Sequence, residues 1–211
     1  MASRPSLLEH ALLGLVHQQP RSGYALRKVF ATTPMAHYSD SPGTIYPALG
    51  RLQRRGWIAG AVANGRSLRP QRVFSITPLG LDQLKGWLAD QVTVEDVAWR
   101  LDDLMLRFAF IDDVLGREAA VGFLGRLGPA IAEHLRALER FHAEWAPGMP
   151  ITGRLALESG IAGFRAQGRW ATHAVRRLEE TGAKGSAGAA AAPQPRRRRD
   201  QRAVRRAPRR R

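Results

Sequence analysis

Apolar residues at helical spacing dominate the first third of the chain. In SLLEHALLGLVH, residues 6–17, they recur every three or four positions, and Ser6 stands where a helix cap is expected. After a turn around Pro20, Ser22 can cap a second, shorter helix with apolar positions at Leu26, Val29 and Phe30. A loop over residues 34–40 follows. The pattern predicts two helices that pack inward.

The next stretch, SDSPGTIYPALGRLQRRGWI at residues 39–58, predicts a third helix ending at Gly56, a residue suited to the left-handed backbone past a helix end. Two starting points are open. Ser41 can cap a helix beginning at Pro42, in which case Pro47 lies in the helix interior, at a cost of about 3 kcal/mol or a kink. Alternatively Thr44 is the cap, and Pro47 falls in the tolerated first turn.

This third helix has an apolar stripe and a basic outer surface. Ile45, Leu49 and Leu52 share one side, while Thr44 and three arginines lie on others. An apolar back with a cationic, hydroxyl-bearing front suits a helix that enters the DNA major groove. The alternative is an ordinary solvated helix face. Three helices with a turn before the third favour a helix-turn-helix, with Tyr24 and Lys28 of the second helix facing phosphates.

After Gly56 the pattern becomes strand-like. Residues 57–62 and 72–77 predict two strands, and Asn64-Gly65 is a hairpin turn signal. The connection and the returning strand carry Arg66, Arg69 and Arg72, which could contact DNA phosphates. An ordinary polar hairpin is the competing interpretation.

The second half of the chain is predicted to be helical. Thr77-Pro78 opens a helix that closes the first domain, and one or two helices follow over residues 93–113. Residues 117–145 carry a heptad-like apolar seam, with a kink or break expected near Gly128, and a last helix follows from Thr152. A helical hairpin with this much apolar surface is typical of a dimer interface.

Charge divides the chain into three parts. Residues 1–92 hold 11 basic and 4 acidic side chains, net +7; residues 93–182 hold 11 and 13, net −2; residues 183–211 hold 11 and 1, net +10. The excess of cations in the first part agrees with an anionic partner there. The last part is rich in Ala, Gly and Pro and then in Arg, so we expect a disordered tail. Either this tail binds nucleic acid without sequence preference, or it has no function.

Several classes of protein are disfavoured. The chain has no cysteine, its six histidines show no compact metal-ligand spacing, and phosphate-binding loops and nucleophile elbows are absent. We therefore expect no enzyme activity, no metal and no cofactor. No apolar run is long enough for a membrane span and the start lacks a signal-peptide pattern, so a cytoplasmic location is expected.

Taken together, GYALRKVF, PGTIYPALGRLQRRGWI, FSITPLG and the closing LALESGIAGF resemble the PadR family of bacterial transcriptional regulators, over roughly residues 6–180. The resemblance implies a mainly α fold with a small β-hairpin: a winged helix-turn-helix DNA-binding domain at residues 1–92 and a carboxy-terminal helical dimerisation domain at residues 93–182. It also implies repression of nearby genes, relieved by a small molecule or another signal. The tail, residues 183–211, has no counterpart in the family pattern.

The resemblance and the residue patterns agree on a set of DNA contacts: Tyr24, Lys28, Ser41, Thr44, Tyr46, Arg51, Arg66, Arg69 and Arg72. The ring of Tyr46 could instead pack under the helix. We expect a homodimer that binds double-stranded DNA at a palindromic operator, with Trp99 as a candidate wall of an effector pocket. The contrasting hypothesis is an adaptor or nonspecific nucleic-acid-binding protein that acts through its basic tail.

Overall fold

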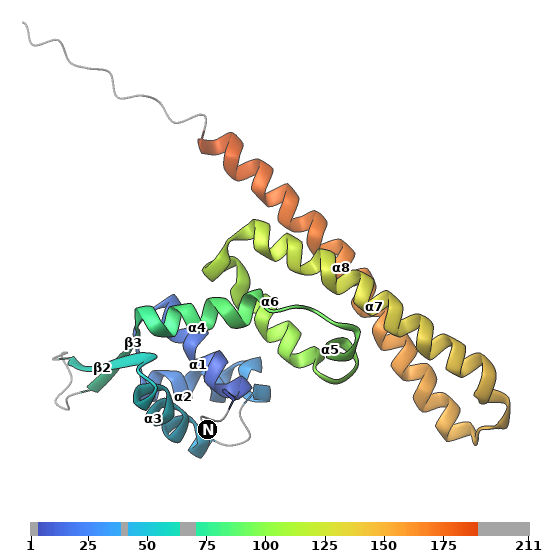
Figure 1. Ribbon diagram of the computed structural model, residues 1–211, viewed down its shortest axis with the longest axis horizontal. Helices are drawn as coiled ribbons and strands as arrows, with labels where there is room; N and C mark the ends of the chain where they lie inside the picture. Colours follow the sequence, from blue (N-terminus) through green and yellow to red (C-terminus); the bar gives the residue numbers. More distant parts are fainter. Residues whose placement is uncertain (1–3, 39–41, 64–70, 190–211) are drawn as a thin grey trace, which may run out of the picture.

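The computed structural model describes residues 4–38, 42–63 and 71–189. A bundle of short helices with a small sheet forms the amino-terminal part, and a long helical hairpin, α7 and α8, extends from it (Figure 1). Along the chain the elements are α1 (Leu7–Gln18), β1 (Arg21–Ser22), α2 (Gly23–Thr32), the 3-10 helices η1 (Pro34–Tyr38) and η2 (Pro42–Thr44), α3 (Ile45–Arg54), β2 (Ile58–Ala63), β3 (Gln71–Ile76), α4 (Pro78–Ala89), α5 (Val94–Trp99), α6 (Leu101–Leu115), α7 (Arg117–Trp145), η3 (Ala146–Gly148) and α8 (Ile151–Ala189).

The helix starts expected from sequence are confirmed where the caps are local. The Ser6 hydroxyl accepts from the Glu9 backbone N–H, and the Glu9 carboxylate accepts from the Ser6 N–H, which completes a capping box for α1. The Ser22 hydroxyl caps α2 by accepting from the Ala25 N–H, and the Thr77 hydroxyl caps α4 by accepting from the Gly80 N–H, with Pro78 in the first turn. These caps depend on residues within three positions of each other, so the sequence alone could predict them.

The sheet contains a strand that the sequence did not predict. The order is β1-β3-β2, antiparallel throughout, with Arg21 opposite Phe74 and Ile58 opposite Ile76. Residues 18–21 were expected to form only a turn, and two strands were expected in all. β1 is two residues long, too short to show alternation, and it exists because β3 offers it hydrogen-bonding partners.

Two apolar clusters form the core, and α6 belongs to both. The first cluster contains residues of α1, α2, α3, α4 and the sheet. It also includes Leu106 and Phe110 of α6. The second joins α5, α7 and α8 to Leu104 and Ile111 of α6. Because one rigid helix contributes to both clusters, it couples the amino-terminal helices to the long hairpin.

Close backbone packing fixes the junction after α3. Gly56 has φ of 71°, the left-handed conformation that was predicted at the end of this helix. In the first turn of α4, Gly80 packs so tightly that a Cβ atom there would lie 2.0 Å from the backbone oxygen of Trp57. Thr77 ties the same region together, because its hydroxyl donates to the Gly56 carbonyl at 2.6 Å.

The break expected near Gly128 is not observed, because α7 is a single helix of 29 residues with Pro129 inside it. Pro129 lies on the exposed side of α7, and the residue four positions earlier is the exposed Gly125. On that side water can hydrogen-bond the carbonyl that the proline leaves without a helical partner, so the helix continues.

The last helix, α8, runs to Ala189 and therefore passes through the boundary at residue 182 that was expected from charge. The remaining tail, residues 190–211, lies outside the described residues, and its disorder stays a prediction. Within the part of the chain that the structure describes, no helix is both long and apolar enough to cross a bilayer.

Candidate nucleic-acid interface

Helix α3 has one buried side and one exposed side. Ile45, Ala48, Leu49 and Leu52 are at most 1% exposed, which confirms the predicted apolar stripe and adds Ala48 to it. The helix begins at Ile45 with Thr44 in the N-cap position, although the Thr44 side chain makes no capping hydrogen bond. Pro47 is thus the third helical residue, in the first turn, where its missing N–H removes no ladder bond.

The exposed side of α3 borders a groove of about 600 Å³ that is shared with α2 and β3. Its lining includes Tyr24, Tyr46 and Arg72. These residues lie on three separate elements, and each was predicted from the sequence to contact DNA. Gln53 and Gln71 add amide groups to the same groove. Aromatic, amide and guanidinium groups around one groove are the side chains that bind phosphates and base edges.

Two glycines allow the side chains of this groove to lie close to the backbone. A Cβ at Gly23 would come within 2.8 Å of the Tyr46 ring, and a Cβ at Gly60 within 2.5 Å of the Arg72 Nε. Tyr46 is nevertheless 53% exposed. One edge of the Tyr46 ring therefore packs against α2 and the remainder is open to solvent, and a contact between Tyr46 and DNA stays a prediction.

Thr44 and Arg51 line a different groove, on the other edge of α3. It has a volume of about 510 Å³ and also includes His37, Tyr38 and Asp102, with the start of α1. His37 Nε2 lies 3.0 Å from an Asp102 carboxylate oxygen, which adds an acidic group to this side. The residues expected to act as one set are thus divided between two grooves, because Thr44 and Arg51 lie on the opposite edge of the helix from Tyr46.

Arg51 is not a free cation. Its Nε donates to the Glu9 carboxylate at 2.8 Å, and Arg55 Nη1 donates to the other oxygen of the same carboxylate at 3.4 Å. Glu9 is only 2% exposed. Burial by itself would raise the pKa of Glu9, but hydrogen bonds from the Ser6 N–H and Arg51, together with the positive charges of Arg55 and Arg51, hold this pKa below its ordinary value.

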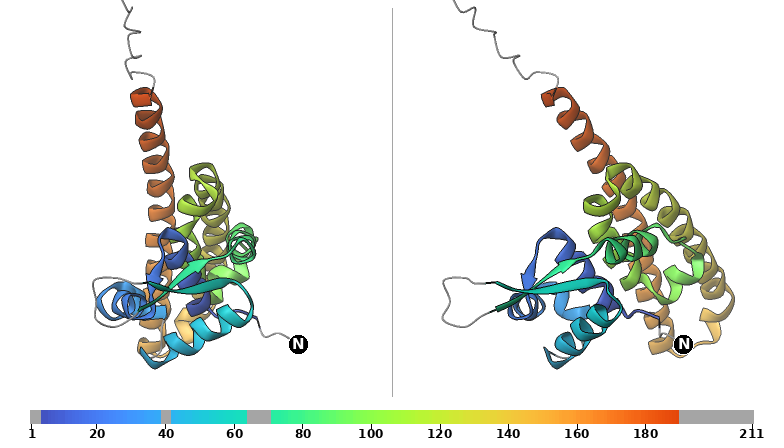
Figure 2. Two further views of the ribbon diagram at one scale, coloured as in Figure 1. Left: turned by 90° about the vertical axis from the view of Figure 1, so that its left-hand side faces the viewer. Right: turned by 60° about the vertical axis from the view of Figure 1, so that its left-hand side comes forward.

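The remaining predicted contacts vary in how far the structure describes them. Lys28 and Tyr24 are exposed on α2, with Tyr24 at 60%. Ser41, Arg66 and Arg69 lie outside the described residues. The paired strands β2 and β3 point away from the helical hairpin formed by α7 and α8 (Figure 2).

One basic residue was missed by the sequence prediction of contacts. Arg54 is exposed on α3, seven residues after Pro47 and four after Gly50, so these three positions share the outermost side of the helix. Counting helical positions from the buried stripe would have identified it, because Arg54 lies nearly opposite Leu52 and Ile45.

The candidate effector residue Trp99 lies at the end of α5 and is 81% exposed. An indole with that much solvent contact leaves little surface to wall a pocket. Trp87 is instead packed against His10, and Trp145 stacks on Phe141 at the end of α7, with ring centroids 6.2 Å apart. Trp87, Trp99 and Trp145 therefore lie in different places and do not form one aromatic pocket, and the effector role of Trp99 stays a prediction.

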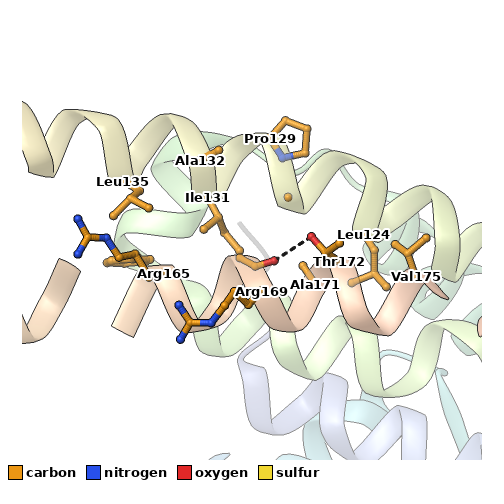
Figure 3. A pocket seen from close by; sticks show the side chains of 13 residues that line it. Leu124, Pro129, Ile131, Ala132, Leu135, Arg165, Arg169, Ala171, Thr172 and Val175 are labelled. Atoms are coloured by element: carbon orange, nitrogen blue, oxygen red, sulfur yellow. Dashed lines mark hydrogen bonds between the residues drawn. The ribbon is translucent and has the colours of Figure 1, made fainter. Parts of the chain in front are cut away.

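A third groove, of about 700 Å³, runs between α7 and α8 (Figure 3). Its floor is apolar, with Leu124, Ile131 and Val175 among the side chains that point into it, while the guanidinium groups of Arg165 and Arg169 lie at its rim. The Thr172 hydroxyl donates to the Gly168 carbonyl at 3.2 Å, so its polar group is satisfied within α8. This groove lies in the part of the chain that was expected to dimerise.

The helix-turn-helix formed by α2 and α3, followed by the β2–β3 hairpin and packed on α1 and α4, defines a winged helix-turn-helix domain. Residues 12–86 match the family model described as the transcriptional regulator PadR-like family, and this domain is therefore a PadR-like domain. The family named from sequence motifs is confirmed over these residues, and the matched family is one of transcriptional regulators.

The chain is also similar to individual proteins. The negative transcriptional regulator PadR of Bacillus subtilis (strain 168) is 26% identical over 121 residues, which are 57% of this chain and 65% of that protein. Among solved structures, Bacillus subtilis PadR in complex with operator DNA is 20% identical, with 81% of this chain and 98% of that chain covered and a TM-score of 0.39. A PadR-like transcriptional regulator from Bacillus cereus is 23% identical, with 84% and 99% covered and a TM-score of 0.39.

Proposed function

We propose that this protein binds a palindromic operator in double-stranded DNA as a homodimer, represses transcription there and is released by a small molecule or another signal. The observation that carries the proposal is the groove beside α3, where Tyr24, Tyr46 and Arg72 from three elements border one open surface. Its support comes from the PadR-like domain over residues 12–86 and from the name of the Bacillus subtilis relative, a negative regulator.

In the proposed complex α3 enters the major groove and the β2–β3 hairpin follows the adjacent backbone. The exposed Arg54 and the half-buried Gln53 then face base edges, while Arg72 and Lys28 contact phosphates. Residues 1–92 carry a net charge of +7, which favours approach to DNA and makes affinity depend on salt. Base contacts from α3 would add the preference for one sequence.

The long hairpin supports the homodimer. Phe141, Trp145, Ile151 and Leu155 are each between 46% and 55% exposed, so large apolar side chains gather where α7 ends and α8 begins. Together with the apolar groove between α7 and α8, they form more exposed apolar surface than an isolated helical hairpin normally keeps in water. In a twofold dimer each hairpin would cover the other, and the two α3 helices would lie about one turn of DNA apart.

The experiment that tests this function is selection of duplexes from a random pool, followed by footprinting on the selected sequence. Protection of one palindromic site, with two half-sites about one helical turn apart, is the expected result. Uniform coating of all duplexes would instead support the second hypothesis, a nonspecific nucleic-acid-binding or adaptor protein that acts through the ten arginines between residues 196 and 211.

A small-molecule signal is testable with tryptophan fluorescence. If Trp99 borders an effector site that is completed in the dimer, candidate aromatic ligands quench its emission, and Trp99→Ala removes that response. Quenching that persists in Trp99→Ala would assign the response to other tryptophans and would end the role of Trp99.

A further inference from the structure

The carboxylate of Glu9 joins the start of α1 to the end of α3. It accepts hydrogen bonds from the Ser6 backbone N–H at 2.9 Å, from Arg51 Nε at 2.8 Å and from Arg55 Nη1 at 3.4 Å. Local sequence explains only the first of these, since Glu9 is the third residue of a capping box. The two arginines are 42 and 46 positions away in the sequence.

This arrangement makes the position of Arg51 depend on Glu9. A carboxylate that is 2% exposed needs paired charges to remain ionised, and the two partners come from α3 and from its C-cap residue, Arg55. The partners differ in exposure: the side chain of Arg51 is 40% exposed, whereas that of Arg55 is 18% exposed and lies 5.0 Å from the centre of the Trp57 ring. Arg55 is therefore placed to hold the two helices together, and Arg51 remains open to a ligand.

Guanidinium geometry decides which donors Arg51 has left. Arginine has five N–H donors in a rigid planar fork, and the bond from Nε to Glu9 occupies one edge of that plane. The two Nη groups at the end of the fork keep donors for a second partner. Such an end-on pair of donors matches two phosphate oxygens or the acceptor edge of guanine. Arg51 also lines the groove that contains Thr44, on the edge of α3.

We propose that Glu9 is a positioning residue for operator recognition: by holding Nε of Arg51, it presents the end of the guanidinium fork to DNA at one fixed angle. The proposal rests on the proposed function, because it assigns a role within the contact made by α3. Glu9 itself does not touch DNA in this proposal. Its negative charge weakens attraction to any duplex slightly, so its benefit is selectivity and not general affinity.

The competing role for Glu9 is structural, as a clamp between α1 and α3. Arg55 separates the two roles, since Arg55→Gln removes one ion pair of the clamp and leaves the bond between Glu9 and Arg51 in place. Loss of the clamp would lower thermal stability in Glu9→Gln and in Arg55→Gln. Loss of positioning would lower selectivity for the operator in Glu9→Gln alone.

The test is a double-mutant cycle with the full-length chain. The dissociation constant is measured for the wild type, Glu9→Gln, Arg51→Gln, the double variant and Arg55→Gln, with the selected operator duplex and with a shuffled duplex of the same composition. Circular dichroism and thermal unfolding of each variant report folding separately.

The expected result is a loss of about tenfold in operator affinity for Glu9→Gln, in the range of one good bidentate base or phosphate contact, with no loss on the shuffled duplex. In the Arg51→Gln background the same change at Glu9 should have almost no further effect, because the residue it positions is absent. Equal and independent losses from the two changes would overturn the proposal, as would a loss of selectivity in Arg55→Gln as large as that in Glu9→Gln.

A second variant carries the test if Glu9→Gln does not fold. Arg51→Lys keeps the positive charge beside Glu9 but has no planar fork, so positioning predicts the same loss of selectivity, whereas affinity equal to the wild type would contradict it. Failure of the proposed function itself looks different. In that case the wild type binds the operator and the shuffled duplex equally before any variant is compared.

Discussion

The imidazole of His10 stacks on the indole of Trp87, with ring centroids 4.2 Å apart and planes 4° from parallel. The contact joins α1 to α4 within the amino-terminal domain, and it leaves His10 only 9% exposed. The pKa of His10 is lowered from 6.5 to about 4. Burial is the largest cause, the negative charge of Glu9 opposes it, and the positive charges of Arg4, Arg55 and Arg107 act in the same direction as burial.

The first prediction follows from this lowered pKa. The unfolded chain takes up a proton on His10 near pH 6.5, whereas the folded chain does so only near pH 4. The contribution of neutral His10 to the stability of the folded state is therefore complete above pH 6.5 and is lost as the pH falls towards 4. Between pH 6.5 and pH 4 the free energy of unfolding should therefore fall by about 3 kcal/mol on account of this one group.

Urea unfolding measured at a series of pH values checks this decrease. His10→Phe keeps an aromatic ring against Trp87 and should flatten the curve between pH 6.5 and pH 4 relative to the wild type. His173→Phe, a change at an exposed position on α8, is the matched control and should keep the curve of the wild type. If His10→Phe shows the same decrease as the wild type, groups other than His10 are responsible.

The second prediction concerns two glycines on α4. A Cβ at Gly80 would lie 2.0 Å from the backbone oxygen of Trp57, which cannot move aside easily, so Gly80→Ala should lower the free energy of unfolding by at least about 2 kcal/mol. Gly86 has no atom within 4 Å of the same position. Gly86→Ala should therefore raise the free energy of unfolding by about 0.5 to 1 kcal/mol, because alanine has the higher helix propensity. Chemical denaturation of both variants decides the matter, and equal effects would contradict the packing described.

The third prediction tests the outermost side of α3. Arg54→Gln should weaken binding to the operator and reduce the dependence of affinity on salt by about one counterion, with little change in stability, because Arg54 is exposed. Arg140→Gln removes an exposed arginine from α7 and is the matched control. Binding measured at several salt concentrations gives the slope, and identical slopes for the two variants would remove Arg54 from the interface.

The fourth prediction tests the dimer. Trp145 is 54% exposed and stacks on Phe141 at the end of α7, so Trp145→Glu should place a charge in the proposed interface and shift the protein to monomers. The neighbouring Glu144→Gln is the control and should sediment like the wild type. Analytical ultracentrifugation measures both. A Trp145→Glu variant that remains dimeric would locate the interface elsewhere on the hairpin.

The fifth prediction concerns the arginine-rich tail. Because α8 runs to Ala189, removal of residues 190–211 keeps this helix and deletes all ten arginines between residues 196 and 211. If the tail binds nucleic acid without sequence preference, the deletion should reduce the salt dependence of binding to operator and shuffled DNA alike. An unchanged slope would show that the tail does not take part in binding.

The sequence by itself determined where α1, α2 and α4 begin, since Ser6, Ser22 and Thr77 cap them through residues three positions away. It also determined the buried stripe of α3, because helical spacing is local, and with the PadR-like motifs it identified the winged helix-turn-helix. Tyr24, Tyr46 and Arg72 were predicted separately as DNA contacts, and their side chains lie around one groove.

Only the tertiary structure decided features that depend on distant neighbours. The strand β1 forms because β3 lies beside it, and α7 continues past Pro129 because that residue faces solvent. The clearest case is Glu9. Local sequence gives it a capping role, but the packing of α1 against α3 buries its carboxylate between Arg51 and Arg55. Charges separated by 42 and 46 positions interact only after the chain has folded, and no local pattern contains that information.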